Sequence, residues 1–176
     1  GLGAPGINEE ELFNELMTVG KKINDFIKPV WTLLNGQIAK NKNILFEGAQ
    51  GSMLDVDFGT YPFVTSSSTN AAAAALGSGI AHNKIDSVLG ITKSYTTRVG
   101  EGPMPTELFD DIGQYLAVEG NEKGPVTGRD RRCGWFDAPL VRRSCLLNGV
   151  TSLALTKIDV LDGLQKIKIC IGYRME

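Results

Sequence analysis

Thr156, Lys157, Ile158 and Asp159 follow directly on an apolar run and form the most informative chemical motif of the chain. A carboxylate held at Asp159 can accept both the N1–H and the exocyclic amino group of guanine in a bidentate, charge-assisted pair. Adenine has no matching donors on that edge, so its binding would leave the carboxylate unpaired at a cost of roughly 1–3 kcal/mol. The motif therefore predicts a guanine-nucleotide site in which the stem of Lys157 covers the base and its ammonium stays in water. An exposed Lys157 beside an Asp159 that caps a turn is the alternative interpretation.

A second candidate site is a loop that combines glycines with arginines. Its residues are Gly124, Pro125, Val126, Thr127, Gly128, Arg129, Asp130, Arg131 and Arg132. Glycine permits close approach of the backbone to a ligand, and the guanidinium fork binds carboxylates and phosphates. The loop therefore suits a doubly anionic substrate, with a solvated basic loop as the alternative.

Gln50 is the third candidate, because it lies in a short glycine-containing segment after the apolar run 44–46. At the end of a strand its amide can meet a nucleotide. From these residues alone a structural turn is the simpler explanation.

The predicted elements place these motifs at the ends of strands. Asn8 is the expected N-cap of a helix whose apolar residues recur every three or four positions, and Pro29 is expected to bend or end that helix. The remaining helices are predicted at 31–39, 71–76, 106–118 and 137–147, the strands at 44–46, 88–91 (extending to 95), 151–155 and 166–173, and a loop at 119–133. This alternation predicts an α/β fold with a mostly parallel central sheet flanked by helices.

Composition restricts the function classes further. The 176 residues are 42% hydrophobic, which favours a single domain with one core. A net charge of -2 gives no indication of a nucleic-acid or membrane-surface partner, and no apolar run approaches the roughly 20 residues that span a bilayer. Three cysteines and one histidine, without metal-site spacing, indicate reduced thiols in a cytoplasmic protein and no metal site.

Taken together and in order, six separated segments resemble the adenylosuccinate synthetase family. They are 46–51, 57–67, 97–103 with 105–107, 127–129, 131–137 and 155–163. The resemblance implies an enzyme that uses GTP to activate the O6 of IMP and then joins L-aspartate to C6, giving adenylosuccinate, GDP and phosphate. It also implies a nucleotide-binding architecture like that of P-loop NTPases and G proteins, incomplete in this chain.

The resemblance also implies roles for individual residues. The residues expected to bind IMP are Gln50, Thr65, Val99 and Arg129. The residues expected to bind aspartate are Pro125, Val126, Thr127, Gly128, Arg129, Asp130 and Arg131. The residues expected to bind GTP are Arg131, Lys157, Ile158 and Asp159. Val126 replaces a second threonine that is usual in the family, which puts one hydrogen bond of the aspartate loop in doubt.

No segment of the chain matches the phosphate-loop pattern G-x-x-x-x-G-K-[ST]. We therefore expect a central fragment of a longer synthetase, without the N-terminal phosphate loop and the C-terminal part. The catalytic residues and the Mg²⁺ site are expected in the N-terminal part, so the fragment alone is expected to be inactive. A homodimer is implied for the full-length enzyme. The alternatives are a non-catalytic guanine-nucleotide binding module and an interaction protein that keeps the fold without the chemistry.

Overall fold

The computed structural model describes residues 6–124 and 128–174, and the chain divides into two compact units. The first contains residues up to Leu45 together with Ser78–Ile80, and the second contains Phe46–Gly77 and the residues from Ala81 onward. Within the first unit, the side chain of Trp31 lies against Gly79, whose left-handed backbone suits the absence of a Cβ there. The interpretation of the chain as one domain stays a prediction.

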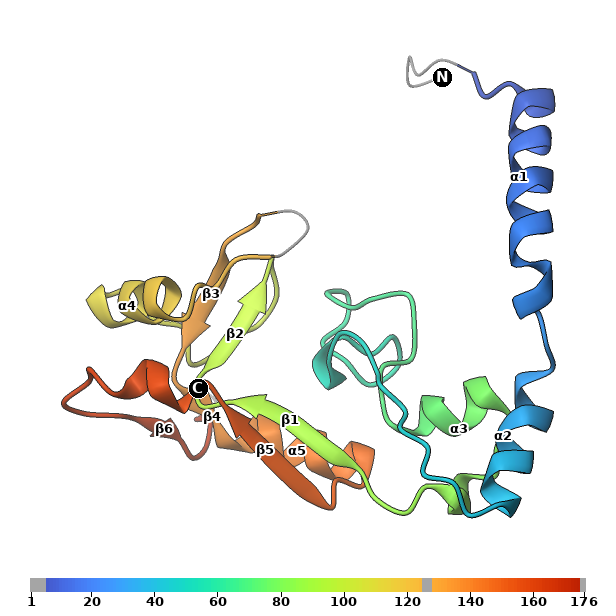
Figure 1. Ribbon diagram of the computed structural model, residues 1–176. Helices are drawn as coiled ribbons and strands as arrows, with labels where there is room; N and C mark the ends of the chain where they lie inside the picture. Colours follow the sequence, from blue (N-terminus) through green and yellow to red (C-terminus); the bar gives the residue numbers. More distant parts are fainter. Residues whose placement is uncertain (1–5, 125–127, 175–176) are drawn as a thin grey trace. The chain divides into compact units, whose positions relative to one another are not determined.

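The helices of the first unit begin close to where the sequence predicts, but the first helix ends earlier than expected. Helix α1 (Glu9–Ile23) begins after Asn8, whose side chain accepts hydrogen bonds from the backbone N–H groups of Glu10 and Glu11. A short 3-10 turn, η1 (Asn24–Phe26), follows, and α2 (Val30–Ala39) begins after Pro29. Helix α1 thus ends before Pro29, where the sequence led us to expect its end or a bend, and Pro29 instead precedes α2. Figure 1 shows the interruption between α1 and α2.

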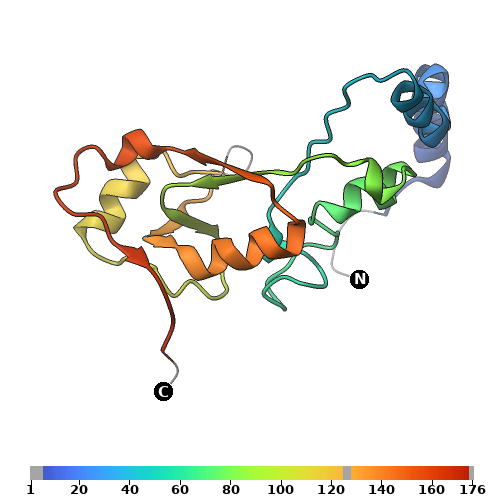
Figure 2. The same ribbon diagram turned by 90° about the horizontal axis from the view of Figure 1, so that it is seen from below.

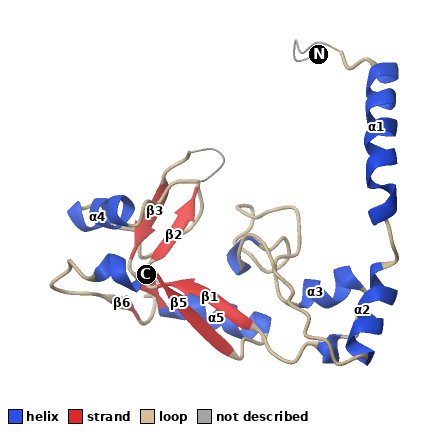
Figure 3. Ribbon diagram, viewed as in Figure 1, coloured by secondary structure: helices blue, strands red, loops and turns tan. Residues whose placement is uncertain are grey.

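The second unit contains three pairs of strands (Figure 3). β1 (Leu89–Lys93) pairs in parallel with β5 (Ser152–Thr156), and β4 (Phe136–Asp137) pairs in parallel with β6 (Ile169–Cys170). β2 (Thr96–Val99) and β3 (Arg131–Gly134) form an antiparallel pair. Parallel pairing thus brings Lys93 and Thr156, the last residues of β1 and β5, to the same edge.

Helices and turns surround these strands. Helix α4 (Asp111–Glu119) packs against β3, and Figures 1 and 2 both show α5 (Ala138–Asn148) alongside β1 and β5. Asp137 caps α5 by accepting from the N–H of Leu140, and Gly149 ends it with a left-handed backbone. The remaining elements are α3 (Ala72–Ser78) and the 3-10 turns η2 (Ser52–Leu54), η3 (His82–Lys84) and η4 (Ile158–Leu161).

The core of this unit lies between α4, β3 and η4. Its buried residues are Tyr95, Leu116, Cys133, Val160 and Leu161. Because Tyr95 follows β1 and Leu161 ends η4, this core fixes the carboxyl ends of β1 and β5 against α4.

Several predicted boundaries are wrong. Residues 44–46 are not a strand in the described part of the chain, and the strand expected at 166–173 is reduced to Ile169–Cys170. The helix expected from 106 begins at Asp111, because Thr106 and Leu108 instead form backbone hydrogen bonds with Trp135 and Cys133. The expected loop 119–133 ends in β3, which pairs with a β2 strand that the sequence did not predict.

Candidate functional site

The motif at 156–159 lies where β5 ends and the chain turns into η4. Lys157 is the turning point, with a left-handed backbone (φ 57°), and its carbonyl accepts a hydrogen bond from the Ser94 hydroxyl at 2.8 Å. The Thr156 hydroxyl donates to the carbonyl of Thr92 on β1. Ile158 and Asp159 are exposed at the start of η4. Ligands of α/β proteins gather at the carboxyl ends of parallel strands, which is where this motif lies.

Two of the predicted site residues, Gln50 and Lys157, have a left-handed backbone conformation. Among described non-glycine residues, positive φ occurs at Asn41, Gln50, Asn121 and Lys157. Asparagine tolerates this conformation, whereas glutamine and lysine adopt it at a cost that surrounding structure must outweigh. Strain of this kind gathers at functional sites, so Gln50 and Lys157 have structural support independent of their sequence motifs.

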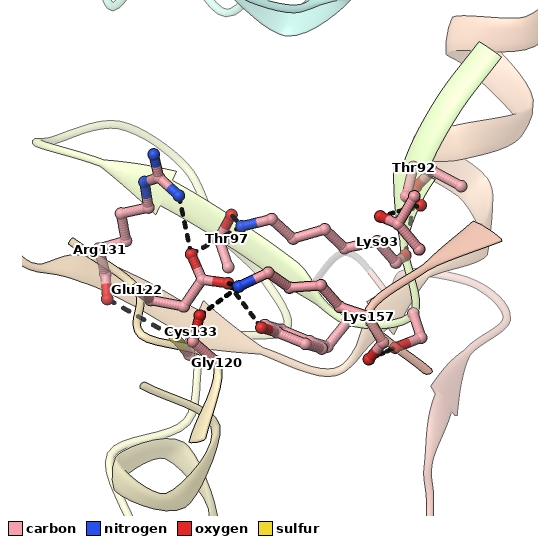
Figure 4. Close-up of polar contacts among 11 residues, drawn as sticks. Thr92, Lys93, Thr97, Gly120, Glu122, Arg131, Cys133 and Lys157 are labelled. Atoms are coloured by element: carbon pink, nitrogen blue, oxygen red, sulfur yellow. Dashed lines mark hydrogen bonds and ion pairs between the residues drawn. The ribbon is translucent and has the colours of Figure 1, made fainter. Parts of the chain in front are cut away.

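A buried carboxylate, Glu122, lies behind the motif and collects four donors (Figure 4). Tyr95 Oη lies 2.5 Å and Lys157 Nζ 3.3 Å from Oε1. Lys93 Nζ lies 2.7 Å and Arg131 Nη1 2.9 Å from Oε2. We call these five residues the Glu122 cluster.

Electrostatics keep Glu122 ionised. Burial opposes its charge, but hydrogen bonds from Lys93, Tyr95 and Arg131 outweigh burial and lower its pKa to about 2. Burial raises the pKa of the Tyr95 hydroxyl most, and the charges of Glu122 and Asp159 raise it further.

The Lys157 ammonium is anchored rather than surrounded by water. It donates to Glu122 and to the carbonyl of Gly120, whereas the sequence led us to expect a solvated head group. Gly120 leaves no room for a side chain, since an added Cβ would meet Tyr95 Oη and the carbonyl of Leu116. The stem of Lys157 is thus held in place from its far end.

Backbone hydrogen bonds join the described residues on the two sides of the arginine loop. The Arg131 N–H donates to the carbonyl of Glu122, and the Gly124 N–H donates to the carbonyl of Arg129. Gly128 has a left-handed backbone, and Asp130 forms an exposed ion pair with Lys123 at 3.7 Å. Arg129 is exposed. Pro125, Val126 and Thr127 lie outside the described residues.

The neighbouring arginine on β3 has a different partner. Arg132 pairs with Glu107 and donates to the carbonyls of Gly100 and Gly102. The guanidinium of Arg131 therefore contacts the Glu122 cluster, whereas that of Arg132 ties the loop 100–102 to β3.

Gln50 and Thr65 belong to a loop organised by Asp55. This carboxylate is 1% exposed and accepts from the N–H groups of Asp57, Phe58, Thr69 and Asn70. These bonds, led by that of Phe58, lower its pKa. The Thr65 N–H donates to the carbonyl of Leu54 at 2.7 Å, and Gln50 is exposed just before η2.

The structure thus brings only some of the predicted residues together. Arg131 and Lys157 share Glu122, and Val99 pairs with Arg131 across β2 and β3. No hydrogen bond or ion pair among the described residues joins Gln50, Thr65 or Arg129 to the cluster. The sequence analysis missed Glu122, Lys93 and Tyr95. The position of Lys93 at a strand end was the one signal available for these three.

Comparison with known proteins places the chain in a family. The family model "Adenylosuccinate synthetase" matches residues 2–176. The chain belongs to the adenylosuccinate synthetase family. A fully ligated adenylosuccinate synthetase from Plasmodium falciparum is 45% identical, with a TM-score of 0.89, over 92% of this chain and 38% of that one. A cyanophage S-2L succinoaminodeoxyadenylate synthetase, bound to dGMP and dATP as an energy donor, is 27% identical, with a TM-score of 0.51, over 62% of this chain and 34% of that one.

These matches confirm two interpretations of the sequence. The resemblance to adenylosuccinate synthetase is correct, and so is the α/β class with parallel strands flanked by helices in a P-loop-like nucleotide-binding fold. The chain spans about two fifths of the length of the Plasmodium synthetase.

Membership of the synthetase family implies Mg²⁺. The described residues contain no group of three or more His, Cys, Asp or Glu side chains that could hold a metal ion. Likewise, no helix of the described segments is long and apolar enough to cross a membrane.

The low pKa of Glu122 predicts a pH-dependent loss of stability in this protein. The ionised carboxylate stabilises the folded state above the ordinary glutamate pKa, and this contribution is lost as the pH falls towards about 2. We expect the difference in unfolding free energy between wild type and Glu122→Gln to shrink by about 2 kcal/mol between pH 5 and pH 3. Urea unfolding at several pH values measures it. Glu119→Gln, an exposed change at the end of α4, is the control. A difference that stays constant with pH would contradict this account.

Proposed function

We propose that the protein is an adenylosuccinate synthetase that joins L-aspartate to IMP with GTP as phosphoryl donor. The observation that carries the proposal is that Lys157 of the guanine motif and Arg131 of the arginine loop contact one buried carboxylate. Two motifs with separate predicted ligands, a guanine nucleotide and a dicarboxylate, therefore lie at one place in a chain of the synthetase family.

In the proposed site, Asp159 accepts the N1–H and amino group of guanine, and the Lys157 stem covers the base. Lys157 suits this task because its backbone turn and its anchored ammonium leave the stem little freedom. Ile158, which is exposed beside them, completes the surface offered to GTP.

Arg131 and Arg129 bind the carboxylates of aspartate. Gln50, Thr65, Val99 and Arg129 bind IMP. The γ-phosphoryl group of GTP is transferred to O6 of IMP, and the aspartate amine then displaces phosphate from C6. The oxo group is a poor leaving group and phosphate a good one, so the first transfer makes the second step feasible. The chain's described residues contribute binding and orientation to both steps.

A second candidate is a ligase with altered nucleotide choice, which is suggested by the phage relative bound to dGMP and dATP. The two candidates differ in the base of the donor and in the nucleotide that accepts the phosphoryl group. Asp159 favours guanine over adenine for the donor, because adenine lacks the two hydrogen-bond donors that a carboxylate needs.

A steady-state assay of the full-length protein with aspartate and Mg²⁺ separates these candidates. We expect adenylosuccinate from IMP with GTP, and little product with ATP as donor or dGMP as acceptor. The 176-residue chain by itself is expected to give no turnover, since phosphoryl transfer depends on electrostatic stabilisation that a phosphate loop supplies. Suppose instead that the protein bound GDP, gave no turnover and showed no affinity for IMP or aspartate in calorimetry. That result would indicate a non-catalytic guanine-nucleotide binding module.

Two further proposals rest on family resemblance, for the homodimer, and on the cysteine content, for the cytoplasm. We propose that the full-length protein is a homodimer and is located in the cytoplasm. Sedimentation of the full-length protein at several concentrations tests the first, and fractionation of cells tests the second.

A further inference from the structure

Glu122 joins four segments that are far apart in sequence. Lys93 ends β1, Arg131 begins β3 and Lys157 follows β5, while Glu122 itself lies just beyond α4. Figure 4 shows the side chains of Lys93, Arg131 and Lys157 converging on the Glu122 carboxylate from these different elements. Each pairs with it at 3.3 Å or less. A single side chain therefore sets the relative positions of two predicted ligand-binding groups.

The carboxylate is oriented from the protein side. Tyr95 is 2% exposed and donates to Oε1, while Lys93 donates both to Oε2 and to the Thr97 hydroxyl. Neither Tyr95 nor Lys93 belongs to the predicted ligand-binding set. They form a fixed frame that determines where the carboxylate points, and hence where Arg131 and Lys157 must lie.

Charge and exposure indicate that the array faces a ligand. Three cations against one carboxylate leave two positive charges in excess. The Glu122 side chain is fully buried, whereas those of Lys93, Arg131 and Lys157 are 24%, 27% and 36% exposed. The excess positive charge thus lies on the outer side, where it attracts anions.

Arg131 keeps donors for a ligand while it is held. A guanidinium has five N–H donors in a rigid fork. Arg131 uses Nη1 on Glu122, and no described residue accepts from its Nη2 or Nε. Glu122 can therefore fix the fork without occupying the donors that would bind a carboxylate.

We propose that Glu122 is a positioning residue that holds Arg131 and Lys157 in one preorganised array, and so fixes the aspartate-binding and GTP-binding groups relative to each other. The inference rests on the proposed function. It assigns Glu122 no contact with substrate. Its effects are passed on by Arg131 to aspartate and by Lys157 to GTP.

The test is steady-state kinetics of the full-length protein with Glu122→Gln. A glutamine removes the charge and offers an amide N–H where the cations need an acceptor. We expect the KM values for aspartate and for GTP each to rise about tenfold or more, consistent with the loss of hydrogen bonds to a charged group, and the KM for IMP to change less than about twofold. A merely structural role would not divide the three substrates in this way.

A matched control removes the other carboxylate that pairs with an arginine of β3. Glu107→Gln removes the carboxylate that pairs with Arg132, as Glu122→Gln does for Arg131, while Arg132 keeps its hydrogen bonds to the carbonyls of Gly100 and Gly102. We expect it to leave the KM values for aspartate and GTP within about twofold of wild type, because Arg132 lies outside the proposed site.

Double variants test whether Glu122 acts through its partners. In an Arg131→Leu background, Glu122→Gln should no longer raise the KM for aspartate, and in a Lys157→Met background it should no longer raise the KM for GTP. If Glu122→Gln fails to fold, Glu122→Asp decides alone. It keeps the charge but shortens the reach, so the same two KM values should rise about threefold while that for IMP stays constant.

The experiments distinguish a failure of the positioning role from a failure of the proposed function. An equal rise in all three KM values, or an undiminished effect in the double variants, would overturn the positioning role and leave the proposed function intact. Absence of adenylosuccinate formation by the wild type would overturn the proposed function and this inference with it.

Discussion

Replacing Asp159 by asparagine should lower kcat/KM for GTP by about 100-fold or more. The amide of asparagine places an N–H group against the donors of guanine, so two charge-assisted hydrogen bonds are lost and a repulsive contact replaces one of them. Xanthine carries an oxygen where guanine carries the amino group, so the variant should accept XTP better than the wild type does. Initial rates with GTP and XTP at saturating IMP and aspartate measure both effects.

Asp162→Asn is the matched control for this change. Asp162 is a second exposed carboxylate of the same turn, immediately after η4. We expect it to leave the preference for GTP over XTP unchanged. If Asp159→Asn also left that preference unchanged, the assignment of the base to this turn would be wrong.

The second large effect is expected at Arg131. Arg131→Leu should raise the KM for aspartate by about 100-fold, because a bidentate guanidinium–carboxylate pair is lost. The change also removes one of the three cations around Glu122, but Lys93 and Lys157 still pair with that carboxylate. The fold should therefore survive, and thermal unfolding checks this directly.

Arg131→Lys separates charge from geometry. Lysine restores the positive charge without the planar fork, so we expect it to recover only part of the affinity for aspartate. Arg142→Leu, an exposed change on α5, is the control and should leave the KM for aspartate unchanged. An Arg131→Leu variant with an ordinary KM for aspartate would exclude this residue from the aspartate site.

Local signals predicted those elements whose ends are set by local chemistry. Asn8 caps α1, and Asp137 and Gly149 bound α5, with partners only a few residues away. The prediction that residues 106–108 belong to a helix was wrong for the opposite reason. Their helical pattern gave way to hydrogen bonds with Cys133 and Trp135, about 25 residues further along the chain. No local pattern encodes such a partner.

The same distinction between local and distant partners applies to the residues of the candidate site. Lys157 and Arg131 belong to motifs whose chemistry is visible in a few consecutive residues. Glu122 lies in a polar, glycine-containing stretch that is typical of a solvated loop. Its side chain is nevertheless fully buried, because it pairs with cations that lie 9, 29 and 35 residues away in the sequence. A buried charge requires such partners, and only the folded chain shows that they are present. Sequence patterns therefore singled out Arg131 and Lys157 but not the carboxylate that pairs with both of them.

The most direct measurement is a crystal structure of the full-length protein with GDP, IMP and aspartate bound. We predict that the Asp159 carboxylate lies about 3 Å from N1 and the amino group of guanine, and that Arg131 binds an aspartate carboxylate while it still contacts Glu122. Guanine bound away from residues 156–159, or Arg131 turned away from both aspartate and Glu122, would contradict the account.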